Sequence, residues 1–154
     1  MKPGSWFQAL VGGTVGTVLM LVVVPAIKAG FEDSVPTSAW LEVADFRVED
    51  AEPGISPTTW LLLTVNRSFV ADLTATVRRV NGDGTLTSVC RGGGRDHYQP
   101  KSRAPDVVSL DRLLEAPGCR LAPARYLVTL AWEITTGAQL LRLVEAESNV
   151  FEVR

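Results

Sequence analysis

Cys90, His97 and Cys119 are the side chains of this sequence best suited to bind a metal or to act in nucleophilic catalysis. A structural zinc site needs four ligands, usually in closely spaced pairs. The chain has two cysteines and one histidine, and neither cysteine has a close partner. A Cys–His nucleophile pair would also lack a third group held beside it by a motif. We therefore expect no metal, no cofactor and no enzymatic activity.

The two cysteines have a simpler use. In an oxidising compartment Cys90 and Cys119 would form one disulfide that closes a loop of about 30 residues and contributes roughly 3–4 kcal/mol of stability. The bridge would join the exit of a predicted hairpin to the segment before a predicted strand at Tyr126. The alternative is a pair of reduced thiols, as expected in the cytosol.

A basic, glycine-rich segment lies between the two cysteines. Three consecutive glycines, Gly92–Gly94, are flanked by arginine, lysine and aromatic residues. Such a loop could bind an anionic group on a lipid, a sugar or an acidic protein. The alternative is an exposed loop whose charges only keep it soluble. The candidate recognition residues are Arg91, Arg95, His97, Tyr98, Lys101 and Arg103.

These residues need a scaffold, and the first thirty residues differ from the remainder of the chain. No charge occurs from Pro3 to Ile27. As an α-helix, Trp6–Ile27 would reach roughly 33 Å, enough to cross a hydrocarbon core of about 30 Å. The run is longer than the apolar region of a signal peptide and lacks a good cleavage site. We therefore expect a tail and a retained transmembrane helix over residues 1–29, followed by a linker over residues 30–39.

Small residues on one face of this helix predict contact with another membrane helix. Gly12 and Gly16 form the small-x-x-x-small pattern that lets two helices approach closely in lipid. The alternative is chance, because glycine is common in membrane helices. The predicted packing residues are Ala9, Gly12, Gly13, Gly16 and Thr17.

The flanking charges favour one orientation. Lys2 precedes the span, whereas Lys28 follows it and is offset at once by Glu32 and Asp33. Positive-inside counting therefore places the N-terminus in the cytoplasm. The C-terminal domain would then be periplasmic or otherwise extracytoplasmic, or the span would lie in the membrane of a virion.

Residues 40–154 show the period-two alternation of an all-β domain. About seven strands with turn signals between them are typical of an antiparallel β-sandwich. The clearest strand begins at Tyr126, with Val128, Leu130, Trp132 and Ile134 on the same face. The apolar run at residues 60–65 predicts a strand covered on both faces. Only residues 109–118 look helical, with Ser109 as the N-cap.

One short segment resembles a known structural element. "LAPARY", from Leu121 to Tyr126, is similar to the tyrosine corner of immunoglobulin-like and fibronectin type III domains. The resemblance implies that the Tyr126 hydroxyl bonds to nearby backbone. The sequence departs from the antibody pattern, because Val128 stands where antibodies have a cysteine. The expected fold is therefore a transmembrane helix followed by an antiparallel immunoglobulin- or fibronectin-III-like sandwich.

Charge and composition limit the function. The net charge of −2 disfavours bulk binding to nucleic acid. We expect a single-pass structural or interaction protein, a non-catalytic accessory subunit of a membrane assembly or of a lipid-containing virion. Its partners would be membrane lipid, other membrane helices or its own copies, and proteins bound by the β-domain. The alternative is an anchored ligand- or carbohydrate-binding module, which would leave one of Trp40, Trp60 or Trp132 exposed.

Overall fold

The computed structural model describes residues 35–115, 118–135 and 141–154, with only the backbone at residues 102–104. Thr37–Arg154 form one compact unit. Its elements are η1 (Thr37–Ala39), β1 (Leu41–Val48), β2 (Thr58–Val65), β3 (Phe69–Val80), β4 (Leu86–Gly92), β5 (Arg95–Tyr98), β6 (Lys101–Ser109), α2 (Leu110–Leu114), β7 (Ala124–Thr135), β8 (Leu141–Glu147) and β9 (Phe151–Val153).

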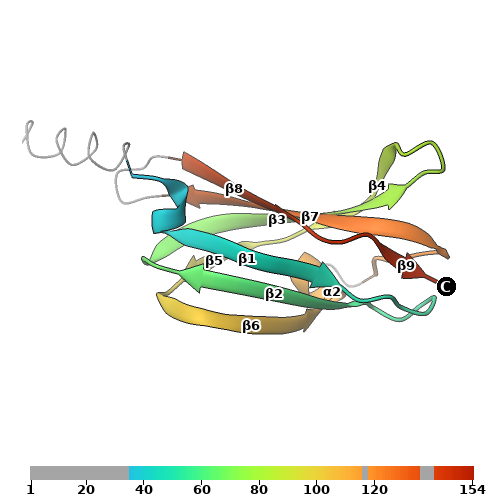
Figure 1. Cartoon of the computed structure of the whole chain (residues 1–154), viewed down its shortest axis with the longest axis horizontal. Coiled ribbons are helices and arrows are strands. Elements are labelled where there is room, and N and C mark those ends of the chain that lie inside the picture. The colour runs from blue at the N-terminus through green and yellow to red at the C-terminus, as the bar shows by residue number, and fades with distance from the viewer. Residues whose placement is uncertain (1–34, 116–117, 136–140) are drawn as a thin grey trace, which may run out of the picture. The chain divides into compact units, whose positions relative to one another are not determined.

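The strands form two antiparallel sheets that lie face to face (Figure 1). The small sheet has the order β1-β2-β6. The large sheet has the order β4-β3-β7-β8, with β5 also paired to β3 and β9 also paired to β7. The expected antiparallel, two-sheet, all-β architecture with one short helix is confirmed.

The membrane part of our expectation is corrected. Among the described residues no helix is long and apolar enough to cross a membrane. The α-helix described, α2, has five residues, which at 1.5 Å each reach about 8 Å, far below the roughly 30 Å of a bilayer core. The expected span and its small-residue face lie outside the described residues. We therefore withdraw the transmembrane helix, the single-pass architecture and the localisation inferred from them.

Alternation along the strands builds the core between the sheets. On β7, Tyr126, Val128, Leu130, Trp132 and Ile134 are all buried, as the sequence predicts. Successive side chains of a strand point to opposite faces, so these five residues share one face of β7. That face packs against the inward residues of the small sheet. The core is closed by aliphatic residues of β2, β3 and α2, among them Leu61, Leu63, Ala75, Val77, Leu110 and Leu114.

The prediction that residues 60–65 are covered on both faces is wrong. Leu61, Leu63 and Val65 are buried, but Trp60 on the opposite face is 39% exposed. The cause is architectural: the small sheet packs against the large sheet on its inner side, and no described element covers its outer side. An apolar run on a strand therefore indicated one buried face only.

A tight hairpin keeps β4 on the same sheet as β3. Asn81 donates its backbone N–H to the Thr85 carbonyl at 2.9 Å, and Gly84 has a φ of 82°. The hairpin predicted from the sequence, with Cys90 near its exit, is therefore confirmed. It also separates the fold from constant-type immunoglobulin domains, in which the fourth strand crosses to the other sheet.

The tyrosine corner is present. The Tyr126 hydroxyl donates to the Ala122 carbonyl at 2.8 Å. The tyrosine ring is buried and lies 5.8 Å from the Phe151 ring, centroid to centroid. The hydrogen bond that the resemblance implied is therefore confirmed, and it fixes the corner that leads into β7.

The predicted helix is shorter than expected. The Ser109 side chain accepts a hydrogen bond from the Arg112 backbone N–H, so Ser109 is the N-cap, as predicted. The helix ends at Leu114 because Glu115 adopts a left-handed conformation with a φ of 49°. The sequence had placed its end at Pro117–Gly118.

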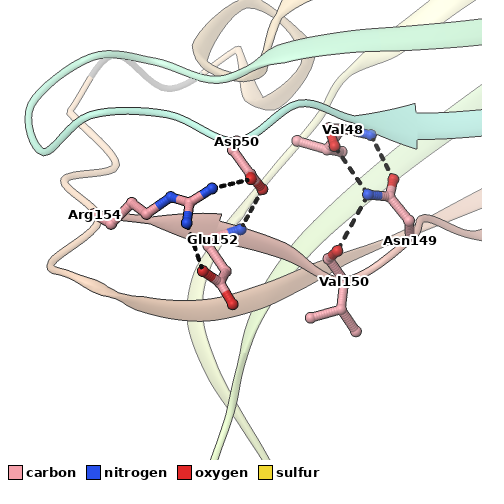
Figure 2. Close-up of polar contacts among 6 residues, drawn as sticks. All are labelled: Val48, Asp50, Asn149, Val150, Glu152 and Arg154. Carbon is pink, nitrogen blue, oxygen red and sulfur yellow. Dashed lines mark hydrogen bonds and ion pairs between the residues drawn. The ribbon is translucent and has the colours of Figure 1, made fainter.

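One side of the sandwich is closed by a polar seam between β1 and the segment that follows β8 (Figure 2). The Asn149 side chain accepts from the Val48 N–H at 2.8 Å and donates to the Val48 carbonyl at 3.0 Å. Asp50 accepts from the Glu152 N–H at 2.8 Å and pairs with the Arg154 guanidinium at 3.2 Å. These contacts join residues about one hundred positions apart.

Candidate interaction surfaces

The disulfide expected between Cys90 and Cys119 is present, with 5.9 Å between the two Cα atoms. Cys90 lies on β4, and Cys119 lies between α2 and β7. The bridge therefore ties the exit of the hairpin to the segment before β7, as predicted. It closes a loop that contains β5, β6 and α2.

The glycine run inside this loop is packed tightly. The Gly93 N–H donates to the Leu114 carbonyl at 2.7 Å. A Cβ atom on Gly92 would lie 2.0 Å from that same carbonyl oxygen, and one on Gly93 would lie 2.0 Å from the Leu73 oxygen. Gly93 also has a φ of 127°. The three glycines allow the chain to pass between α2 and β3, so this part of the segment is tightly packed and is not an exposed loop.

The six predicted recognition residues do not form one loop. Arg91, Arg95 and His97 lie along one edge of the large sheet, on β4 and β5, and all three are exposed. Arg95 forms an ion pair with Asp72 at 3.6 Å. Lys101 is on β6 of the small sheet and is paired with Asp106. Arg103 lies on the same strand, at a position where the structure describes only the backbone.

Tyr98 is half-buried and points toward the core. Its ring stacks on Phe69 with centroids 4.9 Å apart. Its hydroxyl accepts a hydrogen bond from the Trp132 indole N–H at 3.1 Å. Burial raises the pKa of the Tyr98 phenol, and nearby carboxylates raise it further. The structure therefore places Tyr98 on the inward side of β5, opposite Phe69, and not in the same loop as the arginines.

The outer face of the large sheet gathers charges of opposite sign on opposite edges. The strand register places Arg91, Thr76, Thr129 and Glu147 in one row across the four strands. The row beside it contains Thr74, Ala131 and Glu145. The basic edge thus lies on β4 and β5, the acidic edge on β8, and small residues lie between them.

The short side chains leave a shallow hollow of about 450 Å³ on this face. Arg78 and Arg91 line one side of it, and Glu133 and Glu145 line the other. Within the described part of the chain none of these four side chains forms an ion pair. Across one row the backbones of the two edge strands are three strand spacings apart, about 14 Å, and among the described residues no ion pair joins these arginines to these glutamates.

The floor of the hollow contains an unsatisfied hydroxyl. The Thr129 oxygen is buried and has no hydrogen-bond partner among the described residues. Buried side-chain hydroxyls ordinarily have one, because an unmade hydrogen bond is costly. The hollow therefore offers a polar contact at its centre as well as charges at its edges.

Two of the three candidate tryptophans are buried. Trp132 is fully covered, and Trp40 is 4% exposed with the Arg67 and Arg142 guanidinium carbons 5.4 and 5.2 Å from its ring centroid. Trp60 remains accessible on the outer face of the small sheet. Its indole N–H donates to Glu49 at 2.8 Å.

The described residues contain no group of three or more histidine, cysteine, aspartate or glutamate side chains placed to hold a metal ion. Both described cysteines are in the disulfide. His97 lies beside the Gln99 amide on the surface.

No model of a known protein family matches the sequence, and no curated protein matches it. One solved structure similar to this chain is Spo0M, a sporulation control protein from Bacillus subtilis, at 18% identity and a TM-score of 0.37. The match covers 75% of this chain and 50% of that one, so the chain spans half the length of Spo0M.

Proposed function

We propose that Thr37–Arg154 is a non-catalytic interaction domain that binds another protein of a larger assembly through the outer face of the large sheet. The observation that carries this proposal is the set of unneutralised charges around the hollow. The partner would present acidic groups to Arg78 and Arg91, and basic groups to Glu133 and Glu145.

The separation of charge favours a protein as the partner. A polyanion such as nucleic acid would be attracted by Arg91 but repelled by the glutamates of β7 and β8. A protein surface can match both signs, and such matching fixes register and speeds association. The Thr129 hydroxyl would gain a hydrogen bond when the partner covers the floor.

Site-specific photocrosslinking in the native source tests this proposal. A photoreactive amino acid replaces Thr76, at the centre of the outer face, and in a control it replaces Thr64, a half-exposed threonine on the outer face of the small sheet. We expect a discrete crosslinked protein from position 76 and none from position 64. Charge reversal by Arg91→Glu should reduce the yield at least fivefold. Equal crosslinking from both positions, or none from either, would reject the proposal.

A second candidate function is the binding of a carbohydrate or other small ligand at Trp60. Trp60, Arg47, Glu49 and Asn149 line a shallow pocket of about 350 Å³, which puts an aromatic face beside polar groups. Titration of soluble glycans should quench tryptophan fluorescence in the wild-type protein and not in Trp60→Phe. The same response in both proteins, or none in either, would remove this candidate.

A further inference from the structure

A second concavity lies on the open side of the sandwich, between β5 of the large sheet and β6 of the small sheet. We call it the side cleft; its volume is about 410 Å³. Its floor contains Leu61, Leu63, Leu73 and Trp132, while residues of α2 line one wall. Leu61, Leu63 and Trp132 are almost fully buried in the core, so the apolar surface that a ligand can reach comes from the half-buried Leu73, Val108 and Leu113.

The rim of the side cleft is predominantly acidic. Asp96 comes from β5, Asp106 from β6 and Glu115 from the end of α2, and Arg112 is the one basic residue among the lining side chains described. Lys101 pairs with Asp106 from outside the lining. The rim therefore keeps an excess of negative charge over an apolar floor.

Tyr98 lines the cleft, and its pKa responds to the charge of the rim. Its hydroxyl oxygen accepts from Trp132, and among the described residues no acceptor takes its proton. Burial is the largest cause of its raised pKa, and Asp96, Asp106 and Glu115 raise it further. Three carboxylates from three separate elements thus act on one point, where a cleft with low-dielectric walls strengthens their field.

We propose that the side cleft binds an organic cation: an ammonium or guanidinium group carried on a short apolar body. The apolar body would cover Leu73, Val108 and Leu113, and the cation would lie among the carboxylates of the rim. The Tyr98 hydroxyl would be free to donate to an oxygen of the same ligand. The cation could belong to a free amine or to a lysine or arginine side chain of another protein. This inference is independent of the outer face of the large sheet.

Three probes of one shape test the proposal on the full chain. Phenethylamine, phenethyl alcohol and phenylacetate share a phenyl body and differ in charge. Binding is followed by the NMR signal of the Trp132 indole N–H, assigned with Trp132→Phe. We expect the amine to bind at least fivefold more tightly than the alcohol, and phenylacetate not to bind. Added salt should weaken the binding of the amine and leave the binding of the alcohol unchanged.

The variant Asp96→Asn supplies the decisive comparison. It retains the Oδ1 atom that accepts from the His97 N–H, so the fold of β5 is kept while the charge is lost. We expect at least a threefold loss of amine affinity, and no loss in Glu42→Gln, which removes an exposed carboxylate from β1. Equal affinity for amine and alcohol, no binding of either, or unchanged amine affinity in Asp96→Asn would overturn the proposal.

One further arm separates the two sources of the cation. The amine is compared with N-acetyl-lysine methylamide, which presents a lysine side chain on a blocked backbone. Preference for the free amine would support a small-molecule ligand, and preference for the blocked lysine would support a protein side chain. The outcome of the crosslinking at Thr76 does not depend on either result.

Discussion

Asn149 carries the most informative prediction about stability. Its side chain makes the two hydrogen bonds that a neighbouring strand would otherwise make at the edge of β1, one to the N–H and one to the carbonyl of Val48 (Figure 2). It also donates to the Val150 carbonyl at 3.2 Å. Asn149→Ala removes all three hydrogen bonds without changing any buried apolar side chain.

The expected loss of stability follows from the backbone groups of Val48 that lose their hydrogen-bond partners. Each backbone group of Val48 that loses its partner costs about 1–1.5 kcal/mol. Asn149 is exposed, so water replaces part of the loss, and we expect the free energy of unfolding to fall by about 2 kcal/mol. For a domain of this size that corresponds to a decrease in Tm of about 8 °C.

Equilibrium unfolding in urea, with tryptophan fluorescence and far-UV circular dichroism as two probes, measures this change. Gln99→Ala is the matched control, because Gln99 is also exposed but bonds only to side chains, those of Ser68 and His97. Its expected cost is below about 0.5 kcal/mol. If Asn149→Ala and Gln99→Ala unfold at the same urea concentration, the seam does not hold the sandwich closed and the reasoning fails.

Three further outcomes are expected. Replacing Cys90 and Cys119 together by serine should lower the free energy of unfolding by about 3.6 kcal/mol in the chain-entropy model for a separation of 29 residues, measured against the oxidised wild type; a loss below about 1 kcal/mol would contradict it. Gly93→Ala should prevent stable folding, seen as loss of the cooperative thermal transition, because its Cβ would lie 2.0 Å from a backbone oxygen; Gly82→Ala, in open space, is the control and should retain the transition. Because the pKa of Tyr98 is raised in the folded state, the unfolded state loses its phenolic proton first as the pH rises. The contribution of Tyr98 to stability is therefore complete below about pH 10 and is lost as the pH rises through the folded-state pKa. Tyr98→Phe should flatten the decline in urea midpoint above pH 10, and an equally steep decline in the variant would refute this prediction.

Local patterns were sufficient to predict much of the β-domain. The alternation from Tyr126 to Ile134, the hairpin before Cys90 and the capping serine at Ser109 each reflect interactions between residues close in sequence. The disulfide was predictable for a different reason, because a chain with two cysteines allows one pairing.

Features set by contacts between distant residues were missed. The sequence Gly92–Gly94 has the composition of a flexible loop, and only the approach of Leu114 and Leu73 shows that side chains are excluded there. The outer face depends in the same way on register: Arg91 and Glu147 are 56 positions apart and share a row only because β3 and β7 lie between them. A run such as residues 60–65 does not reveal whether one or two layers cover it.

The seam of Figure 2 has a consequence for synthesis of the chain. Val48 and Asn149 are separated by 101 residues, so at 5–20 residues per second roughly 5 to 20 s pass between the translation of one and of the other. During that interval β1 is an unprotected sheet edge, able to pair with the same strand of a neighbouring nascent chain. Glu42, Asp45 and Arg47 place charges along that edge, and charged side chains are a means by which natural sheets discourage such pairing. We therefore expect the charges on β1 to discourage such pairing during translation, before Asn149 is available to satisfy the backbone of Val48 at the end of the strand.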